Sequence, residues 1–126
     1  VANQVIKCMN LKGIVVKESK ILILGISFKE NCPDIRNTKV VDIYSVLSEY
    51  TNNITVYDPW VDPMSVKHEY GIAVVNKLPI DKFDTVILAV AHKEFLKMNI
   101  QSLVKYVHVI YDVKGYLERS IIDSRL

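Results

Sequence analysis

Residues 20–38 of the chain read KILILGISFKENCPDIRNT. The apolar run from Ile21 to Leu24 is short and continuous, which is typical of a strand buried on both faces of a parallel sheet. Gly25 follows the run, and Asn37 or Thr38 can cap a helix that extends to about residue 50. A strand, an irregular loop and a helix in this order predict the first unit of an α/β fold.

The same alternation continues along the chain. Further strands are expected at residues 54–57, 72–75, 84–90 and 108–111. Further helices are expected at residues 1–13, at 63–70 between Asp62 and Gly71, and at 93–105 with a break near Asn99, and residues 117–126 are expected to form a short helix or a frayed tail. Parallel strands joined by right-handed crossovers follow from this order. The sequence therefore predicts a three-layer α/β sandwich with a parallel, Rossmann-like sheet of about five strands.

Composition limits the class of protein. The 126 residues are 50% hydrophobic, and 16 Lys and Arg against 14 Asp and Glu give a formal net charge of +2. A chain of this length is one domain, long enough to bury a hydrophobic core. So small an excess of positive charge argues against nucleic acid or a membrane surface as a partner. Two cysteines and three scattered histidines favour neither a disulfide framework nor a metal site. Without a visible signal peptide or spanning segment, a cytoplasmic location is expected.

The expected helix over residues 1–13 has no start signal before it. Its apolar residues Val5 and Met9 fall on one face, and Gly13 can end it. A helix that begins without a cap predicts that the chain is a fragment of a longer one.

Three loops are expected at the mouth of the sheet, where ligands bind in such folds. They follow the first, fourth and fifth of the five expected strands, at residues 25–36, 91–93 and 112–115. The first loop has one glycine, so it lacks the G-x-G-x-x-G spacing of a dinucleotide site. It does carry Lys29 and Arg36 just before a helix, and Lys114 is expected across the same mouth. Such cations favour a phosphorylated ligand, whereas surface pairs of Arg36 with Asp34 or of Lys29 with Glu30 are the alternative.

Single residues near these loops have two interpretations each. Phe28 can stack on a base or pack in the core, and Trp60 can form a lid or an interface. Asp58 stands where a ribose-binding acid would, but Asp before Pro is also a turn initiator. His92 can be a general base or a hydrogen-bonding residue at a helix start, and Cys32 has no neighbouring base that would make it a nucleophile. No complete set of catalytic residues is visible, so the sequence predicts binding, with the chemistry elsewhere.

Three motifs resemble one known family. Residues 22–38, Val56 to Pro59 and Tyr111 to Gly115 are similar to the C-terminal, UDP-binding domain of the UDP-glucose/GDP-mannose dehydrogenase family, and the resemblance covers nearly the whole chain. The stretches KENCPD and DVKG look most like the bacterial UDP-N-acetylhexosamine 6-dehydrogenases.

The resemblance implies that residues 1–13 end a long inter-domain helix and that residues 14–126 are the UDP-sugar-binding domain. It implies a longer enzyme, a homodimer or higher oligomer, with an N-terminal NAD domain and a central region that carries the catalytic cysteine. Such an enzyme oxidises a UDP-sugar, UDP-N-acetylhexosamine or UDP-glucose, to the uronic acid in two NAD-dependent steps for surface polysaccharide synthesis.

The resemblance also implies residue roles. Phe28 and Lys29 would contact the nucleotide-sugar, and Arg36 would reach NAD bound mainly by another domain. Lys114 stands where UDP-glucose dehydrogenases offer an arginine to the substrate, and lysine keeps the charge but not the bidentate geometry. The alternative function is a stand-alone nucleotide-binding α/β regulatory module without catalysis.

Overall fold

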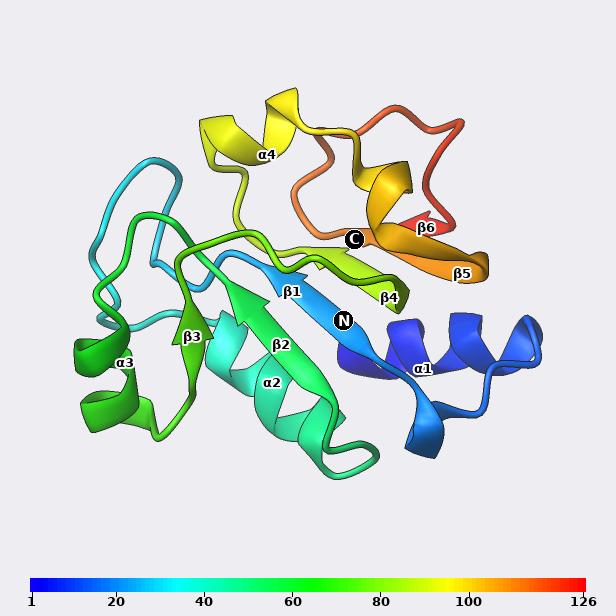
Figure 1. The fold of residues 1–126 in the computed structure, drawn as a ribbon, viewed down its shortest axis with the longest axis horizontal. Helices are drawn as coiled ribbons and strands as arrows, with labels where there is room; N and C mark the ends of the chain where they lie inside the picture. The colour runs from blue at the N-terminus through cyan, green and yellow to red at the C-terminus, as the bar shows by residue number, and fades with distance from the viewer.

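Six parallel strands form one sheet at the centre of the computed structural model, which describes residues 1–126. The strands lie in the order β3-β2-β1-β4-β5-β6, and every neighbouring pair is parallel (Figure 1). This is the order of a Rossmann-type sheet: β2 and β3 are added on one side of β1, and β4, β5 and β6 are then added on the other, so the strand order reverses between β1 and β4. The predicted parallel α/β fold is confirmed.

The strands are β1 (Ile21–Leu24), β2 (Ile54–Tyr57), β3 (Val74–Val75), β4 (Phe83–Leu88), β5 (Val104–Asp112) and β6 (Ser124–Arg125). The α-helices are α1 (Ala2–Leu11), α2 (Val40–Ser48), α3 (Pro63–Tyr70) and α4 (Lys93–Lys97), and two short 3-10 helices are η1 (Val16–Glu18) and η2 (Ile100–Leu103). None of the helices is long and apolar enough to cross a bilayer.

Both faces of the sheet are covered, which explains the continuous apolar run of β1. Alternate residues of a strand point to opposite faces, so Ile21 and Ile23 pack in a core with α1 and α2, while Leu22 and Leu24 pack with Phe95 of α4 on the other side. Figure 1 shows α1 and α2 on one side of the sheet and α4 on the other. All four β1 side chains are fully buried, and each contributes about 1.5–3 kcal/mol to folding.

Local signals placed α3 correctly. The Asp62 side chain accepts a hydrogen bond from the backbone N–H of Met64, Pro63 is the first helical residue, and Gly71 ends the helix in the left-handed conformation with φ +71°. The predicted break near Asn99 is also confirmed, because it separates α4 from η2.

The C-terminal segment differs from the expected helix or tail. Residues 124–125 form β6 and add a sixth strand at the open edge of β5. Two groups on Asp123 fasten it: the backbone N–H donates to the carbonyl of Ile110 at 2.8 Å, and the carboxylate accepts from the Ile110 N–H at 2.7 Å. β5 also begins at Val104, four residues earlier than expected, so it takes over the end of the predicted helix. Pairing with an existing strand edge overrides the weak local preference of both segments.

Candidate functional site

A cavity of about 280 Å³ lies at the carboxyl ends of β1, β4 and β5, where the strand order reverses. The loops after these three strands line it, and they include Phe28, Lys39, Val90 and Lys114. The N-terminus of α2, at Val40, also opens into it. Because this edge is where open parallel sheets bind ligands, the cavity is the candidate site.

The structure brings two cationic side chains to this cavity. Lys114 follows β5, and its ammonium lies 3.1 Å from the carboxylate of Glu30. Lys39 stands at the N-cap position of α2 and forms no ion pair. Although burial opposes ionisation of Glu30, hydrogen bonding to its own backbone N–H and the charge of Lys114 lower its pKa. The cavity thus combines Lys39, a partly compensated Lys114 and the positive end of the α2 dipole, all of which attract an anion.

Lys29 and Arg36 lie in the same β1–α2 loop (residues 25–39) but do not line the cavity. Arg36 pairs with Asp34 at 3.0 Å on the surface, with 84% of its side chain exposed. Hydrogen bonds from Arg36, with a smaller effect of the Lys29 charge, lower the pKa of Asp34 to about 2. The surface pairing of Arg36 that the sequence allowed is therefore present, whereas Glu30 pairs with Lys114 and not with Lys29.

Phe28 is on the wall of the cavity and is 54% exposed. It belongs to neither of the two apolar cores, so the packing role considered from the sequence does not apply. An exposed aromatic ring beside two lysines suits a planar base or a sugar face.

Gly25 allows the β1–α2 loop to leave the sheet close to the loop after β4. Its φ is +95°, and a Cβ atom added there would lie 2.5 Å from Cβ of Val90. Only glycine fits both this conformation and this close approach.

Asp58 is fully buried at the end of β2. One carboxylate oxygen accepts hydrogen bonds from the backbone N–H groups of Ile26 and Ser27, at 2.8 and 3.2 Å, and the other accepts from Trp60 N–H at 2.8 Å. Burial raises the pKa of Asp58, but hydrogen bonds from His92, Ile26 and Trp60 outweigh burial and leave the pKa below its ordinary value. Asp58 is a turn-forming residue that also fixes the start of the β1–α2 loop.

Asp112 has the same task at the end of β5. Its buried carboxylate accepts hydrogen bonds from the backbone N–H groups of Lys114, Gly115 and Leu117, at 3.0, 2.8 and 2.7 Å. These bonds fold residues 112–117 into a tight turn, and Gly115 supplies the positive φ of +75°. The turn holds the backbone of Lys114 at the cavity.

The residues at the carboxyl ends of β1 and β2 do not fit a dinucleotide. The β1–α2 loop has Gly25 alone, and Asp58 has no exposed surface and no free oxygen for a ribose hydroxyl. No group of three or more His, Cys, Asp or Glu side chains is arranged to bind a metal ion. Lys39, Lys114 and the N-terminus of α2 suit the cavity to an anionic ligand.

A larger hollow of about 530 Å³ lies at the opposite edge of the sheet, beside Lys12, Asp84 and Lys105. Lys12 is paired with Asp123, and Lys105 is paired with Asp84 at 3.1 Å. Because both cations have carboxylate partners and no α-helix begins there, this hollow is the weaker anion site.

Two residues of the site were not singled out from the sequence. Lys39 is the third cation of the β1–α2 loop, and its place just before an expected helix was the available signal. Asn31 has a positive φ of +53°, and its side-chain oxygen accepts a hydrogen bond from Lys93 N–H at 2.8 Å, a contact across 62 residues that no local pattern reveals.

Comparison with protein families gives one match. Residues 22–119 match the model described as UDP-glucose/GDP-mannose dehydrogenase family, UDP binding domain. Two relatives, each named UDP-N-acetyl-D-glucosamine 6-dehydrogenase, are similar over 100% of this chain: that of Salmonella typhi at 44% identity and that of Pseudomonas aeruginosa at 46%. The chain spans about 30% of the length of the first and 31% of the second.

Solved structures agree with the fold. A UDP-D-ManNAc dehydrogenase from Pyrococcus horikoshii aligns over 98% of this chain and 29% of its own, with a TM-score of 0.76 at 18% identity. An NDP-N-acetyl-D-galactosaminuronic acid dehydrogenase from Methanosarcina mazei Go1 aligns over 92% of this chain and 25% of its own, with a TM-score of 0.79 at 20% identity. At these identities the likeness concerns the fold alone.

Proposed function

The chain belongs to the UDP-glucose/GDP-mannose dehydrogenase family, and we propose that it binds the uridine diphosphate group of a UDP-sugar within a longer NAD-dependent 6-dehydrogenase. The observation that carries this proposal is the cavity at the carboxyl edge, where Lys39, Lys114 and the N-terminus of α2 meet. A diphosphate is recognised by cationic side chains and by helix N-termini together. Phe28, exposed at the same wall, offers a surface for the uracil or sugar ring.

The substrate we propose is a UDP-N-acetylhexosamine, with UDP-glucose as the alternative. The name shared by the relatives at 44% and 46% identity supports this choice. The product would be the corresponding uronic acid, which we propose serves surface polysaccharide synthesis.

The division of labour follows from the share of the relatives that the chain spans. We propose that residues 1–13 end a helix that joins this domain to the others and that residues 14–126 bind the nucleotide. Oxidation and the main NAD site would lie on the other domains, in agreement with a β1–α2 loop that does not fit a dinucleotide. Closing this domain over the reacting sugar would exclude water from the site.

For Lys29 and Arg36, which lie outside the cavity, we propose the roles that the family resemblance implies. Lys29, beside Phe28 in the chain, would contact the nucleotide-sugar when the domains close. Arg36 has 84% of its side chain exposed and is paired only with Asp34, and we propose that it reaches NAD bound by a neighbouring domain.

Calorimetry of UDP with the 126-residue chain tests the proposal. We expect weak binding without dehydrogenase activity, and we expect Lys114→Ala to weaken it about tenfold, because a charge-assisted phosphate contact contributes about 1.5 kcal/mol. Lys17→Ala is the matched control, since Lys17 is exposed in η1, away from the cavity. Stronger binding of GDP than of UDP, or equal losses in both variants, would contradict the proposal.

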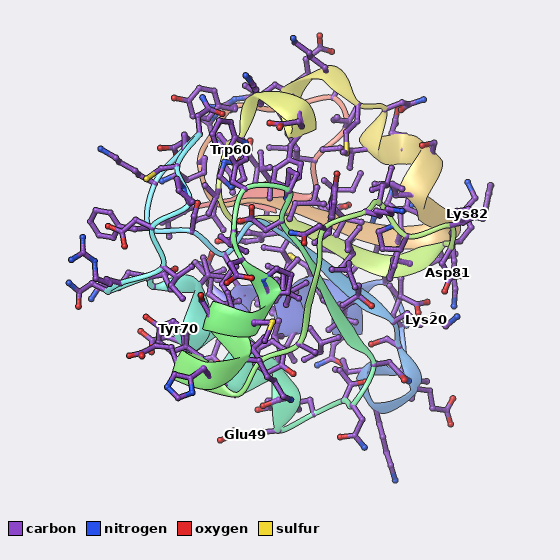
Figure 2. The ribbon with its side chains drawn as sticks, turned by 60° about the vertical axis from the view of Figure 1, so that its left-hand side comes forward. Lys20, Glu49, Trp60, Tyr70, Asp81 and Lys82 are labelled. Atoms are coloured by element: carbon purple, nitrogen blue, oxygen red, sulfur yellow. The ribbon has the colours of Figure 1, made fainter.

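Glu30→Gln is expected to strengthen UDP binding about twofold to fivefold at low salt. The Glu30 carboxylate lies 3.1 Å from the Lys114 ammonium and competes with a diphosphate for it. The gain should shrink at 0.5 M salt because screening weakens the competition. Glu49→Gln removes the same charge at the C-terminal end of α2, the end opposite to the one that opens into the cavity (Glu49 is labelled in Figure 2), and should leave affinity unchanged.

A further inference from the structure

His92 connects three elements at the base of the β1–α2 loop, yet the proposed chemistry does not use it. Its ring is fully buried at the start of α4. Nε2 lies 3.0 Å from a carboxylate oxygen of Asp58 and 3.2 Å from the hydroxyl of Ser27, and Nδ1 lies 2.9 Å from the backbone nitrogen of Asn31. The ring is therefore held on both of its nitrogens by groups of the domain itself.

The partners fix which ring nitrogen carries the proton. Asn31 N–H can only donate, so Nδ1 must accept and carries no hydrogen. The Ser27 hydroxyl donates to the carbonyl of Lys29 at 2.8 Å, so its oxygen receives a hydrogen bond from His92. Both contacts require a neutral ring with its hydrogen on Nε2, shared between Asp58 and Ser27.

Asn31 is the point at which the loop is fastened to α4. Its N–H donates to His92, and its side-chain oxygen accepts from Lys93 N–H at 2.8 Å. The residue holds a left-handed conformation, φ +53°, that non-glycine residues rarely adopt without such contacts. Phe28 and Lys29 lie within three residues of it.

We propose that His92 is a positioning residue: through its Nδ1 it holds Asn31 and thereby sets the place of Phe28 on the cavity wall and of Lys29 beside it in the loop. The Nε2 contact with Asp58 orients the ring, and the Nδ1 contact places the loop. The effect on nucleotide binding rests on the proposed function, whereas the effect on the loop does not. Trp60 lies over the same ring, with centroids 5.9 Å apart, and its Nε1–H donates to Glu94 at 2.9 Å; Figure 2 shows it beside α4.

Two substitutions separate the two nitrogens. In His92→Asn the amide oxygen lies one bond from Cγ, as Nδ1 does, so it can still accept from Asn31 N–H. In His92→Gln the amide nitrogen reaches the place of Nε2 and can still donate to Asp58, but nothing accepts from Asn31. We expect His92→Gln to lower the hydrogen-exchange protection of the Asn31 amide about tenfold or more, and to lower the affinity for UDP about tenfold. We expect His92→Asn to change the protection and the affinity by no more than about threefold relative to the unsubstituted chain.

The measurements are amide exchange by ¹⁵N NMR and calorimetry of UDP on the 126-residue chain. Equal changes in both variants, or a larger loss in His92→Asn, would overturn the proposal. If the variants do not fold, the ring ¹⁵N shifts of the unsubstituted chain decide: a neutral ring protonated at Nε2 supports it, and an imidazolium or an Nδ1–H ring sinks it. If the unsubstituted chain fails to bind UDP, the proposed function is wrong, and the exchange data still decide the role of His92.

Discussion

Gly25→Ala is expected to lower the free energy of unfolding by about 3–5 kcal/mol, the largest loss among alanine substitutions of the four glycines. The added Cβ would lie 2.5 Å from Cβ of Val90 and 3.1 Å from the Val90 nitrogen. Val90 cannot move away easily, because its N–H is bonded to the carbonyl of Leu24 at 3.1 Å. The φ of +95° adds backbone strain to the steric overlap.

Urea unfolding followed by circular dichroism measures this loss. Gly71→Ala is the matched control, because Gly71 also has a positive φ, +71°, but no atom lies within 4 Å of an added Cβ. Strain alone should cost Gly71→Ala about 1–2 kcal/mol. The difference between the two variants therefore isolates the close approach of β1 and the loop after β4. Equal losses would mean that this approach is looser than the structure shows.

The sequence predicted those parts of the fold in which local signals and burial agree. Ile21 to Leu24 form a continuous apolar run because both faces of β1 are covered. The side chain of Asp62 caps the start of α3, and the left-handed backbone of Gly71 ends it. β6 was missed because a two-residue strand has no pattern of its own. Its place is set by the edge of β5, through Asp123 and Ile110.

The site was predictable in location but not in detail. The topology places the loops after β1, β4 and β5 together, and Phe28 and Lys114 do share a cavity. The sequence offered the Arg36–Asp34 pair only as one of two alternatives, and it could not show that Glu30 pairs with Lys114, because side-chain direction depends on the path of an irregular loop. The roles of Asp58 and His92, 34 residues apart, depend on contacts that exist only in the folded chain.

Asp58→Asn is expected to cost about 3 kcal/mol or more in the free energy of unfolding, since it leaves buried hydrogen-bonding groups unpaired. Ile26, Ser27, Trp60 and His92 all direct N–H groups at the two carboxylate oxygens. An asparagine has one acceptor oxygen, so in either orientation its NH₂ group faces at least one of these donors. No rearrangement of the amide alone can satisfy all four.

The pH dependence of this loss is a second, independent signature. Because the pKa of Asp58 is lowered in the folded chain, its ionised form favours folding; the stabilisation is complete above the ordinary pKa of 3.8 and disappears as pH falls through the folded value. The difference in unfolding free energy between the unsubstituted chain and Asp58→Asn should therefore be steady from about pH 5 upward and shrink below about pH 4.

Asp62→Asn is the control, since asparagine caps a helix as well as aspartate does, and it should cost only a few tenths of a kcal/mol. Urea unfolding of both variants across this pH range decides the matter: losses of similar size would show that Asp58 is an ordinary turn residue and does not hold the β1–α2 loop in place.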